Sequence, residues 1–246
     1  MALRPDIGGV LVDAFDTVYV INLVYRTDRR ADMDVELARI GLSFDHPKLH
    51  LFRAMRPEAA AGWPTIGARG CFESHLGVLD QACAAGDRQI LVLEDDVRWS
   101  EALLVTPAET LAALLAKDWA CLYGGPIKAT RTDLPPTLRV LPAEEALIGL
   151  HCVALRAPFM QAAQPMLHAM CNRPPGHPDG GPMHVDGAYN HVRRAHPDLR
   201  AVIADPGLAH QRASRTDVHD LRWFDRLPVL RSGVAALRRW RNQRHG

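Results

Sequence analysis

The chain has 246 residues, of which 48% are hydrophobic and 23% charged, and its formal net charge is +1. This length suits one large domain, and the composition is typical of a folded soluble protein and excludes a disordered chain. A net charge so close to zero gives no indication of a nucleic-acid partner.

Strand and helix signals alternate along the chain. Short apolar, β-branched runs predict strands, and apolar residues at helical spacing predict helices. The predicted strands are 18–23, 49–53, 89–93, 120–123, 149–155 and 201–204. Helices are predicted around Met33–Ile40, from Glu73 to Gly86, from a capping residue Thr106 onward, after residue 155 with a break near Pro165, and from Asp186 to about Arg194.

This alternation predicts βαβ units with right-handed crossovers. The expected fold class is therefore α/β, with a mostly parallel central sheet flanked by helices. In such sheets, ligands bind beyond the carboxyl ends of the strands. The strand ends are consequently where functional residues are sought.

The cysteines and the apolar segments indicate the compartment. The five cysteines are odd in number and form no CxxC pair: Cys71, Cys83, Cys121, Cys152 and Cys171. This pattern favours reduced thiols in a cytosolic protein over a disulfide framework or a zinc site. The first residues lack the features of a signal peptide, and no run of ~18 apolar residues occurs, so we expect neither secretion nor a membrane-spanning helix.

The most informative segment is the acidic end of the third predicted strand, Leu91 to Asp96. Three adjacent carboxylates, Glu94, Asp95 and Asp96, repel one another after a buried apolar run. A divalent cation such as Mg²⁺ or Mn²⁺, which prefers carboxylate and phosphate oxygens, resolves this repulsion. The alternative is a solvated acidic turn before the next helix.

Basic residues follow the first predicted strand. Arg26, Arg29 and Arg30 lie where that strand is expected to meet a helix. Basic side chains and the helix N-terminus at such a junction can bind phosphate groups. The alternative is that these arginines are solvated residues of the first helical turn. The absence of GxGxxG and GxxxxGK[ST] motifs leaves a dinucleotide site or a P-loop without support.

Three segments, in this order, resemble glycosyltransferase family 25, which includes bacterial lipooligosaccharide galactosyltransferases and collagen hydroxylysine galactosyltransferases. The first is Val-Ile-Asn-Leu-x-x-Arg-x-Asp-Arg at 20–29. The second is Gly70-Cys71-x-x-Ser74-His75-Leu76, preceded by Gly67, and the third is Val-Leu-Glu-Asp-Asp at 92–96. The resemblance covers residues 18–97. Weaker similarities follow at 149–155, at Val185-Asp186 and from Gln211 to Asp217 with Ser214.

This resemblance implies a GT-A-type domain over residues 1–228, with a nucleotide-sugar half at about 18–125 and an acceptor half at about 126–228. It implies transfer of a hexose, commonly galactose, from a UDP-sugar to a saccharide or glycolipid acceptor of lipopolysaccharide or lipooligosaccharide. Transfer is expected to invert the anomeric centre and to depend on Mn²⁺ or Mg²⁺. The alternative function is a catalytically degenerate member that binds sugars or partners.

The resemblance and the strand-end rule together assign candidate site residues. Asn22, Leu23, Arg26 and Arg29 are expected at the nucleotide end of the donor. Further donor-site candidates are Gly67, Gly70, Ser74, His75, Glu94 and Asp95. Asp95 and Asp96 are the candidate metal ligands, and His210 is a candidate third ligand. Asp186 is the candidate general base. A surface loop histidine and a plain helix cap are the alternatives for His210 and Asp186.

The C-terminal segment 229–246 is basic and contains no acidic residue. Its arginines are Arg231, Arg238, Arg239, Arg241 and Arg244, and Val234, Leu237 and Trp240 repeat at helical spacing. This pattern predicts a helix that either holds the protein at an anionic membrane surface or packs on its own domain. The expected location is therefore the cytoplasm, with peripheral attachment at the inner face of the plasma membrane as an option.

Overall fold

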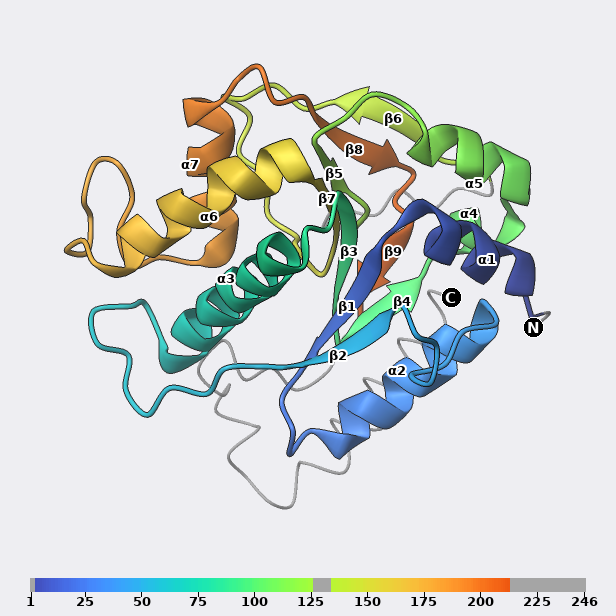
Figure 1. Ribbon diagram of the computed structural model, residues 1–246, viewed down its shortest axis with the longest axis horizontal. Coiled ribbons are helices and arrows are strands. Elements are labelled where there is room, and N and C mark those ends of the chain that lie inside the picture. Colours follow the sequence, from blue (N-terminus) through green and yellow to red (C-terminus); the bar gives the residue numbers. More distant parts are fainter. Residues whose placement is uncertain (1–2, 126–133, 213–246) are drawn as a thin grey trace.

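The computed structural model describes residues 3–125 and 134–212. A central sheet contains seven of the strands, in the order β2-β1-β3-β7-β5-β8-β6, and helices cover both of its faces (Figure 1). The strands are β1 Thr17–Asn22, β2 Leu49–Arg53, β3 Gln89–Glu94, β4 Val97–Trp99, β5 Cys121–Tyr123, β6 Thr137–Val140, β7 Cys152–Arg156, β8 Ala201–Asp205 and β9 Ala209–Gln211. The helices are α1 Pro5–Ala14, α2 Thr27–Arg39, α3 Ile66–Ala85, α4 Glu101–Val105, α5 Ala108–Leu115, α6 Ala157–Cys171 and α7 Val185–Ala195.

The pairing of strands confirms an α/β fold with a mostly parallel sheet. β2, β1 and β3 pair in parallel, as do β5 and β8. β7 runs antiparallel to both β3 and β5, and β6 runs antiparallel to β8. The two reversed strands therefore depart from the uniform direction that the βαβ pattern predicts.

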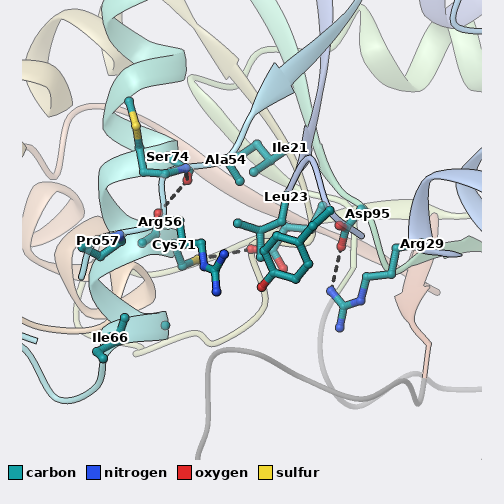
Figure 2. A pocket seen from close by; sticks show the side chains of 15 residues that line it. Ile21, Leu23, Arg29, Ala54, Arg56, Pro57, Ile66, Cys71, Ser74 and Asp95 are labelled. Atoms are coloured by element: carbon teal, nitrogen blue, oxygen red, sulfur yellow. Dashed lines mark hydrogen bonds and ion pairs between the residues drawn. The ribbon is translucent and has the colours of Figure 1, made fainter. Parts of the chain in front are cut away.

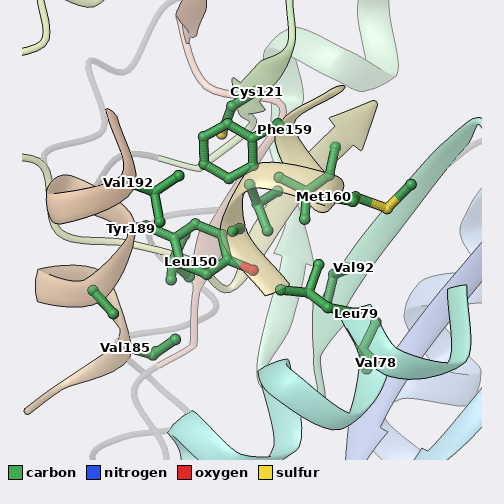
Figure 3. Packing of buried hydrophobic residues seen from close by; sticks show 14 of the residues in the cluster. Val78, Leu79, Val92, Cys121, Leu150, Phe159, Met160, Val185, Tyr189 and Val192 are labelled. Atoms are coloured by element: carbon green, nitrogen blue, oxygen red, sulfur yellow. The ribbon is translucent and has the colours of Figure 1, made fainter. Parts of the chain in front are cut away.

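Successive side chains of the central strands point alternately into two separate hydrophobic layers, as expected for a sheet that is covered on both faces. Val18 and Val20 pack with α1, α2, α4 and α5, whereas Tyr19 and Ile21 pack with α3, α6 and α7. Figure 3 shows the second layer, in which Tyr189 of α7 lies among side chains from α3, α6 and the sheet.

Helix α3 is longer than predicted. It begins at Ile66 rather than at Glu73, and Thr65 is its N-cap, where its hydroxyl accepts a hydrogen bond from the Ala68 amide at 2.9 Å. Gly67 and Gly70 lie in this first part and weaken the sequence signal for a helix, because glycine has a low helix propensity. The predicted end is confirmed: Gly86 follows the helix in the left-handed conformation that favours glycine (φ 75°).

Three other helix boundaries differ from the predictions. Thr106 does not cap α5; it follows α4, and its hydroxyl donates to the Ala102 carbonyl at 2.5 Å. α6 continues through Pro165 instead of breaking there. Asp186 is not a helix cap either, because His184 occupies that position and the Asp186 side chain accepts from the Gly149 amide instead. Only for Asp186 is the contact long-range, since Gly149 lies 37 residues away in the chain.

A two-stranded ribbon of β4 and β9 lies beside the main sheet and has no counterpart among the predicted elements. The two strands pair antiparallel, with Arg98 opposite His210. Each has three residues, which is too short for a periodic pattern to reveal. The ribbon matters for function because it brings the 209–212 segment back to the residues that immediately precede β4.

Several sequence predictions fall outside the described residues. They are the basic segment 229–246 and the Ser214 and Asp217 positions of the closing element. Within the described residues, no helix combines the length and the apolar character that crossing a bilayer requires.

Two neighbouring glycines in α1 provide a matched test of how this helix packs. A Cβ on Gly8 would overlap the backbone carbonyl oxygen of Ile40, while a Cβ on Gly9 would meet nothing within 4 Å. We expect Gly8→Ala to lower the free energy of unfolding by ~1–3 kcal/mol through overpacking. Gly9→Ala should raise it by ~0.5–1 kcal/mol, because alanine is the better helix former. Urea unfolding of both variants checks this, and an equal effect of the two would contradict the observed packing of α1.

Candidate functional site

The acidic segment predicted from sequence lies at the centre of the fold. Glu94 is the last residue of β3, and Asp95 and Asp96 form the turn before β4. Because β3 sits between β1 and β7, this turn is surrounded by other elements, and Asp95 and Asp96 are only 5% and 4% exposed. The solvated acidic turn considered above is therefore excluded. Two buried carboxylates in sequence require compensation from their surroundings.

The compensation comes largely from the segment after β1. The Arg29 Nη1 atom lies 2.7 Å from Asp95 Oδ1 (Figure 2). The same atom lies 3.4 Å from Asp96 Oδ2. Asn22, at the carboxyl end of β1, donates from Nδ2 to Asp95 Oδ2 at 2.8 Å. Arg29 is thus a largely buried partner of the acidic pair, with 11% of its side chain exposed, and the alternative of a solvated arginine is wrong for this residue. Arg30, by contrast, is exposed.

A second set of contacts comes from the end of β9. Gln211 Nε2 donates to Asp96 Oδ2 at 3.0 Å. The Arg212 backbone amide donates to the Asp96 carbonyl at 2.7 Å, and its guanidinium donates to the Asp95 carbonyl at 2.7 Å and pairs with Asp32. Arg212 was not identified from the sequence, because nothing in the local pattern indicates that residue 212 returns to residue 95.

Asp96 lies where a negative charge is unfavourable. Burial and the nearby Glu94 carboxylate raise the pKa of Asp96 to about 7. Its Oδ1 atom is buried without a hydrogen-bond partner among the described residues. Burial acts against the charge of Arg29, but the carboxylates of Asp96 and Asp95 outweigh it and raise the Arg29 pKa. The pair therefore keeps an unmet demand for positive charge that Arg29 only partly satisfies.

A first cavity of about 230 Å³ opens in front of Asp95 (Figure 2). Its walls come from the segments that follow β1 and β2 and from the first half of α3. The lining residues are Ile21, Leu23, Tyr25, Arg29, Ala54, Met55, Arg56, Pro57, Ile66, Gly67, Gly70, Cys71, Ser74, Glu94 and Asp95. A Cβ on Gly70 would lie 2.7 Å from the Met55 carbonyl oxygen, so glycine is required for α3 to close against this wall.

Aromatic and cationic groups meet at the outer side of this first cavity. The Arg56 guanidinium lies 4.6 Å from the centre of the Tyr25 ring, which is 48% exposed. Cavities that combine an apolar wall, an exposed ring and an arginine suit a ligand with a flat heterocycle and an anionic group. Tyr25 and Arg56 were not among the predicted site residues.

A second cavity of about 710 Å³ lies on the other side of Glu94. Asp186, His151 and Asn190 line it, together with Asp96, Gln211 and Arg212 from the acidic turn and β9. Asp186 Oδ1 accepts a hydrogen bond from the Gly149 amide at 2.7 Å. Burial raises the pKa of Asp186 against this hydrogen bond, and the Glu94 charge adds to the rise.

Glu94 and Cys71 line both cavities and form the wall between them. His75, which is 1% exposed, approaches Glu94 Oε1 with Nε2 at 3.3 Å, and the Cys71 Sγ atom lies 3.5 Å from the same oxygen. Burial tends to raise the pKa of Glu94, but the hydrogen bond and charge of His75 outweigh this and lower it. The wall between the cavities therefore carries an ionised carboxylate.

Most of the predicted site residues meet at these two cavities. Those lining one or both are Leu23, Arg29, Gly67, Gly70, Ser74, Glu94, Asp95, Asp96 and Asp186, while Asn22 and His75 support the lining from behind. Arg26 instead precedes α2 and pairs with Asp28 at 2.9 Å. His210 lines neither cavity; the next residue along β9, Gln211, makes the contact with Asp96. A metal-ligand role for His210 stays a prediction.

The raised pKa of Asp96 has a consequence for stability. An aspartate in an unfolded chain titrates near ~3.9, so the folded protein holds this proton more tightly. The resulting stabilisation is fully present below ~3.9 and is lost as the pH rises through about 7. We expect Asp96→Asn to raise the thermal midpoint of the metal-free protein above pH 7, with ~2–4 °C for each ~1 kcal/mol relieved. The gain should shrink as the pH falls toward ~4.

Thermal unfolding in the presence of a chelator, at several pH values, checks this expectation. Asp34→Asn is the matched control, because Asp34 is exposed on α2 and contacts neither cavity. A midpoint for Asp96→Asn that is lower than wild type above pH 7, or a gain that does not vary with pH, would show that burial of the Asp96 charge is not costly.

Comparison with known proteins gives one family and a structural similarity. Residues 15–123 match the model of glycosyltransferase family 25 (LPS biosynthesis protein). Among solved structures, the chain is similar to the crystal structure of a glycosyltransferase involved in the glycosylation of the major capsid of PBCV-1. The TM-score is 0.47 at 11% identity, over 80% of this chain and 93% of that one. No curated protein sequence matches the chain.

The family match spans β1 to β5 and thus contains Asn22, Arg29 and the acidic turn, but neither Asp186 nor His210. It confirms the resemblance described from the three sequence segments and the predicted enzyme class, a glycosyltransferase.

Proposed function

We propose that this chain transfers a hexose from a UDP-sugar to a saccharide acceptor. The match of residues 15–123 to the model of glycosyltransferase family 25 supports this proposal. Galactose is the proposed sugar, and lipopolysaccharide or lipooligosaccharide is the proposed acceptor. The proposed fold type is GT-A and the proposed transfer is inverting. The observation that carries the proposal is the pair of cavities that meet at Glu94, beside the buried Asp95-Asp96 turn.

The first cavity suits the donor. Its exposed Tyr25 ring and the apolar Leu23 side chain offer a surface for a flat base. Arg29 lies at the inner end, next to the acidic turn, where a diphosphate would extend from that base. A diphosphate would draw Arg29 toward itself, because phosphate oxygens accept the same hydrogen bonds that Asp95 now accepts.

The acidic turn fits a hard divalent cation such as Mn²⁺ or Mg²⁺. Carboxylate oxygens of Asp95 and Asp96 converge on a single guanidinium nitrogen, and Asp96 Oδ1 has no partner among the described residues. Asp95 and Asp96 would hold the ion, and Gln211 would orient Asp96. When bound, such an ion supplies charge neutralisation for the leaving diphosphate. Release of Arg29 to the diphosphate would free the carboxylates for this role.

The second cavity suits the acceptor, because it is the larger of the two and many of its lining groups are polar. Asp186 is the proposed general base. The Gly149 amide fixes one of its oxygens, and its raised pKa makes it a stronger base than an exposed aspartate. It would take the proton from an acceptor hydroxyl as that oxygen attacks the anomeric carbon and the nucleoside diphosphate leaves. The ionised Glu94 would stand beside the reacting centre.

The donor class can be tested by thermal unfolding with UDP, GDP and CMP, each with and without Mn²⁺. We expect UDP with Mn²⁺ to raise the midpoint most, since a ligand at ~100 times its dissociation constant contributes ~2.7 kcal/mol. Asp96→Asn should lose the metal-dependent part of the shift, whereas the exposed Asp34→Asn should keep it. If no nucleotide shifts the midpoint, the donor proposal fails and a non-catalytic module that binds sugars or partners becomes the better account.

The role of Asp186 can be separated from binding. We expect Asp186→Asn to reduce kcat by ~10²–10⁴, the usual contribution of a general base. Its amide oxygen can still accept from Gly149, so the UDP-induced thermal shift should remain. Asp198→Asn, an exposed aspartate beyond α7, is the control. The measurement is UDP release in the presence of acceptor glycans, and a variant that retains the wild-type kcat would exclude Asp186 as the base.

A further inference from the structure

A second cluster of potential metal ligands lies at the wall between the two cavities. Cys71 and His75 are four residues apart on α3 and so project from the same face of the helix. Glu94 reaches them from the end of β3. One potential ligand atom from each of the three residues lies within 4.8 Å of the others.

The two ligand-atom distances that involve Glu94 match those of a tetrahedral site. Bonds of ~2.0–2.3 Å from a zinc ion to nitrogen, oxygen and sulfur place neighbouring ligand atoms ~3.3–3.8 Å apart. The His75 Nε2 to Glu94 Oε1 distance is 3.3 Å, and the Cys71 Sγ to Glu94 Oε1 distance is 3.5 Å. Glu94 therefore already lies at ligand-to-ligand distance from both neighbours, and all three ligand atoms lie within 4.8 Å of one another.

The chemistry of this cluster differs from that of the Asp95-Asp96 turn. A thiolate and an imidazole favour borderline-soft ions such as Zn²⁺ or Co²⁺, while two carboxylates favour Mn²⁺ or Mg²⁺. Without a cation, burial and the Glu94 charge raise the pKa of the Cys71 thiol well above its ordinary value. A divalent ion reverses this effect, because coordination removes the thiol proton.

Within the described residues, the cluster contains three protein ligands. His75 is held in place by an edge-on contact with the Tyr189 ring, whose centre lies 6.0 Å away. The Nδ1 atom of His75 is buried and has no hydrogen-bond partner within the described part of the chain. Cys71 and Glu94 both line the two cavities, so a fourth ligand can approach from either one. Three protein ligands with one open position are typical of exchangeable zinc sites rather than closed structural ones.

We propose that Cys71, His75 and Glu94 form a binding site for a borderline-soft divalent cation of the Zn²⁺ type, and that its occupation inhibits sugar transfer. Inhibition follows because an ion at this wall takes the Glu94 carboxylate and occupies the place where donor and acceptor must meet. The binding part stands on the geometry of the cluster alone, while the inhibition part rests on the proposed function. The sequence does not reveal such a site through a CxxC motif, because two of its ligands come from one turn of α3 and the third comes from the end of β3.

The binding part is tested with Co²⁺, which gives a near-ultraviolet thiolate-to-metal absorption only when a cysteine coordinates it. The full chain, freed of metal with a chelator and then desalted, is titrated with Co²⁺. We expect this absorption in the wild type and its loss in Cys71→Ser and Cys71→Ala. Competition by Zn²⁺ should show that His75→Gln weakens Zn²⁺ binding by ~10-fold or more, since even substitutions outside the ligand shell have such effects.

Matched controls separate this site from the other cysteines and from the acidic turn. Cys83→Ser lies on the same helix and Cys171→Ser on α6, both part-buried, and both should retain the absorption. Asp96→Asn should also retain it, because an oxygen-only site gives no thiolate signal. Absence of the signal in the wild type, or its survival in both Cys71 variants, would overturn the proposal. The circular dichroism spectrum of each variant shows whether it is folded.

The inhibition part is tested by adding Zn²⁺ to a transfer reaction that contains excess Mn²⁺. The ratio of rates with and without Zn²⁺ should fall in the wild type and in Cys83→Ser, and it should fall far less in Cys71→Ser. An equal fall in all three would place the inhibition elsewhere. This outcome is distinct from failure of the proposed function, in which no transfer and no nucleotide-induced shift would be seen while the Co²⁺ signal persisted.

Discussion

The buried ion pair between Arg29 and the Asp95-Asp96 turn is the interaction on which the site depends. Two carboxylates at the end of a central strand are costly to bury, and removing the partner of a buried charge costs ~3–5 kcal/mol. The chain meets this demand from two distant segments. Asn22 ends β1 and Arg29 follows it in α2, while Gln211 ends β9 and Arg212 follows it. The same demand makes the turn suited to bind a further cation, because Arg29 compensates the Asp96 charge only partly and Asp96 Oδ1 has no hydrogen-bond partner among the described residues.

The position of the first cavity follows from the direction in which the chain leaves the sheet. After β1 the chain continues into α2, which packs in the hydrophobic layer on one face. After β2 it continues into α3, which packs in the layer on the other face. The two connections diverge at the carboxyl ends of adjacent strands, and a crevice opens between them, as is general for α/β sheets. Gly70 lets α3 pack closely against the segment after β2, because a side chain there would meet the Met55 carbonyl oxygen.

The wall between the cavities unites the two proposals made for this protein. Glu94 lines both the first and the second cavity, and its neighbours Cys71 and His75 contact its carboxylate. In the proposed transfer this carboxylate stands free beside the reacting centre, and in the proposed inhibition it becomes a ligand of a soft cation. The Asp95-Asp96 turn begins one residue after Glu94. The two sites differ in their metal-ligand atoms, because the Cys71, His75 and Glu94 cluster includes sulfur and nitrogen, whereas the turn offers only side-chain oxygen.

Residue patterns by themselves determined the strands β1, β2, β3 and β8, the end of α3 at Gly86, and the acidic turn after β3, since each is a local property of hydrophobic period, glycine conformation or charge. Tertiary structure alone decided the reversed direction of β7, the start of α3 and the contact of Asp186 with Gly149 instead of with its own helix. It also decided that Gln211 and Arg212, rather than His210, reach the acidic turn, because β9 had to pair with β4 before they could meet. Short-range patterns fix which segments are strands and helices, but contacts between residues more than a hundred positions apart arise only from packing.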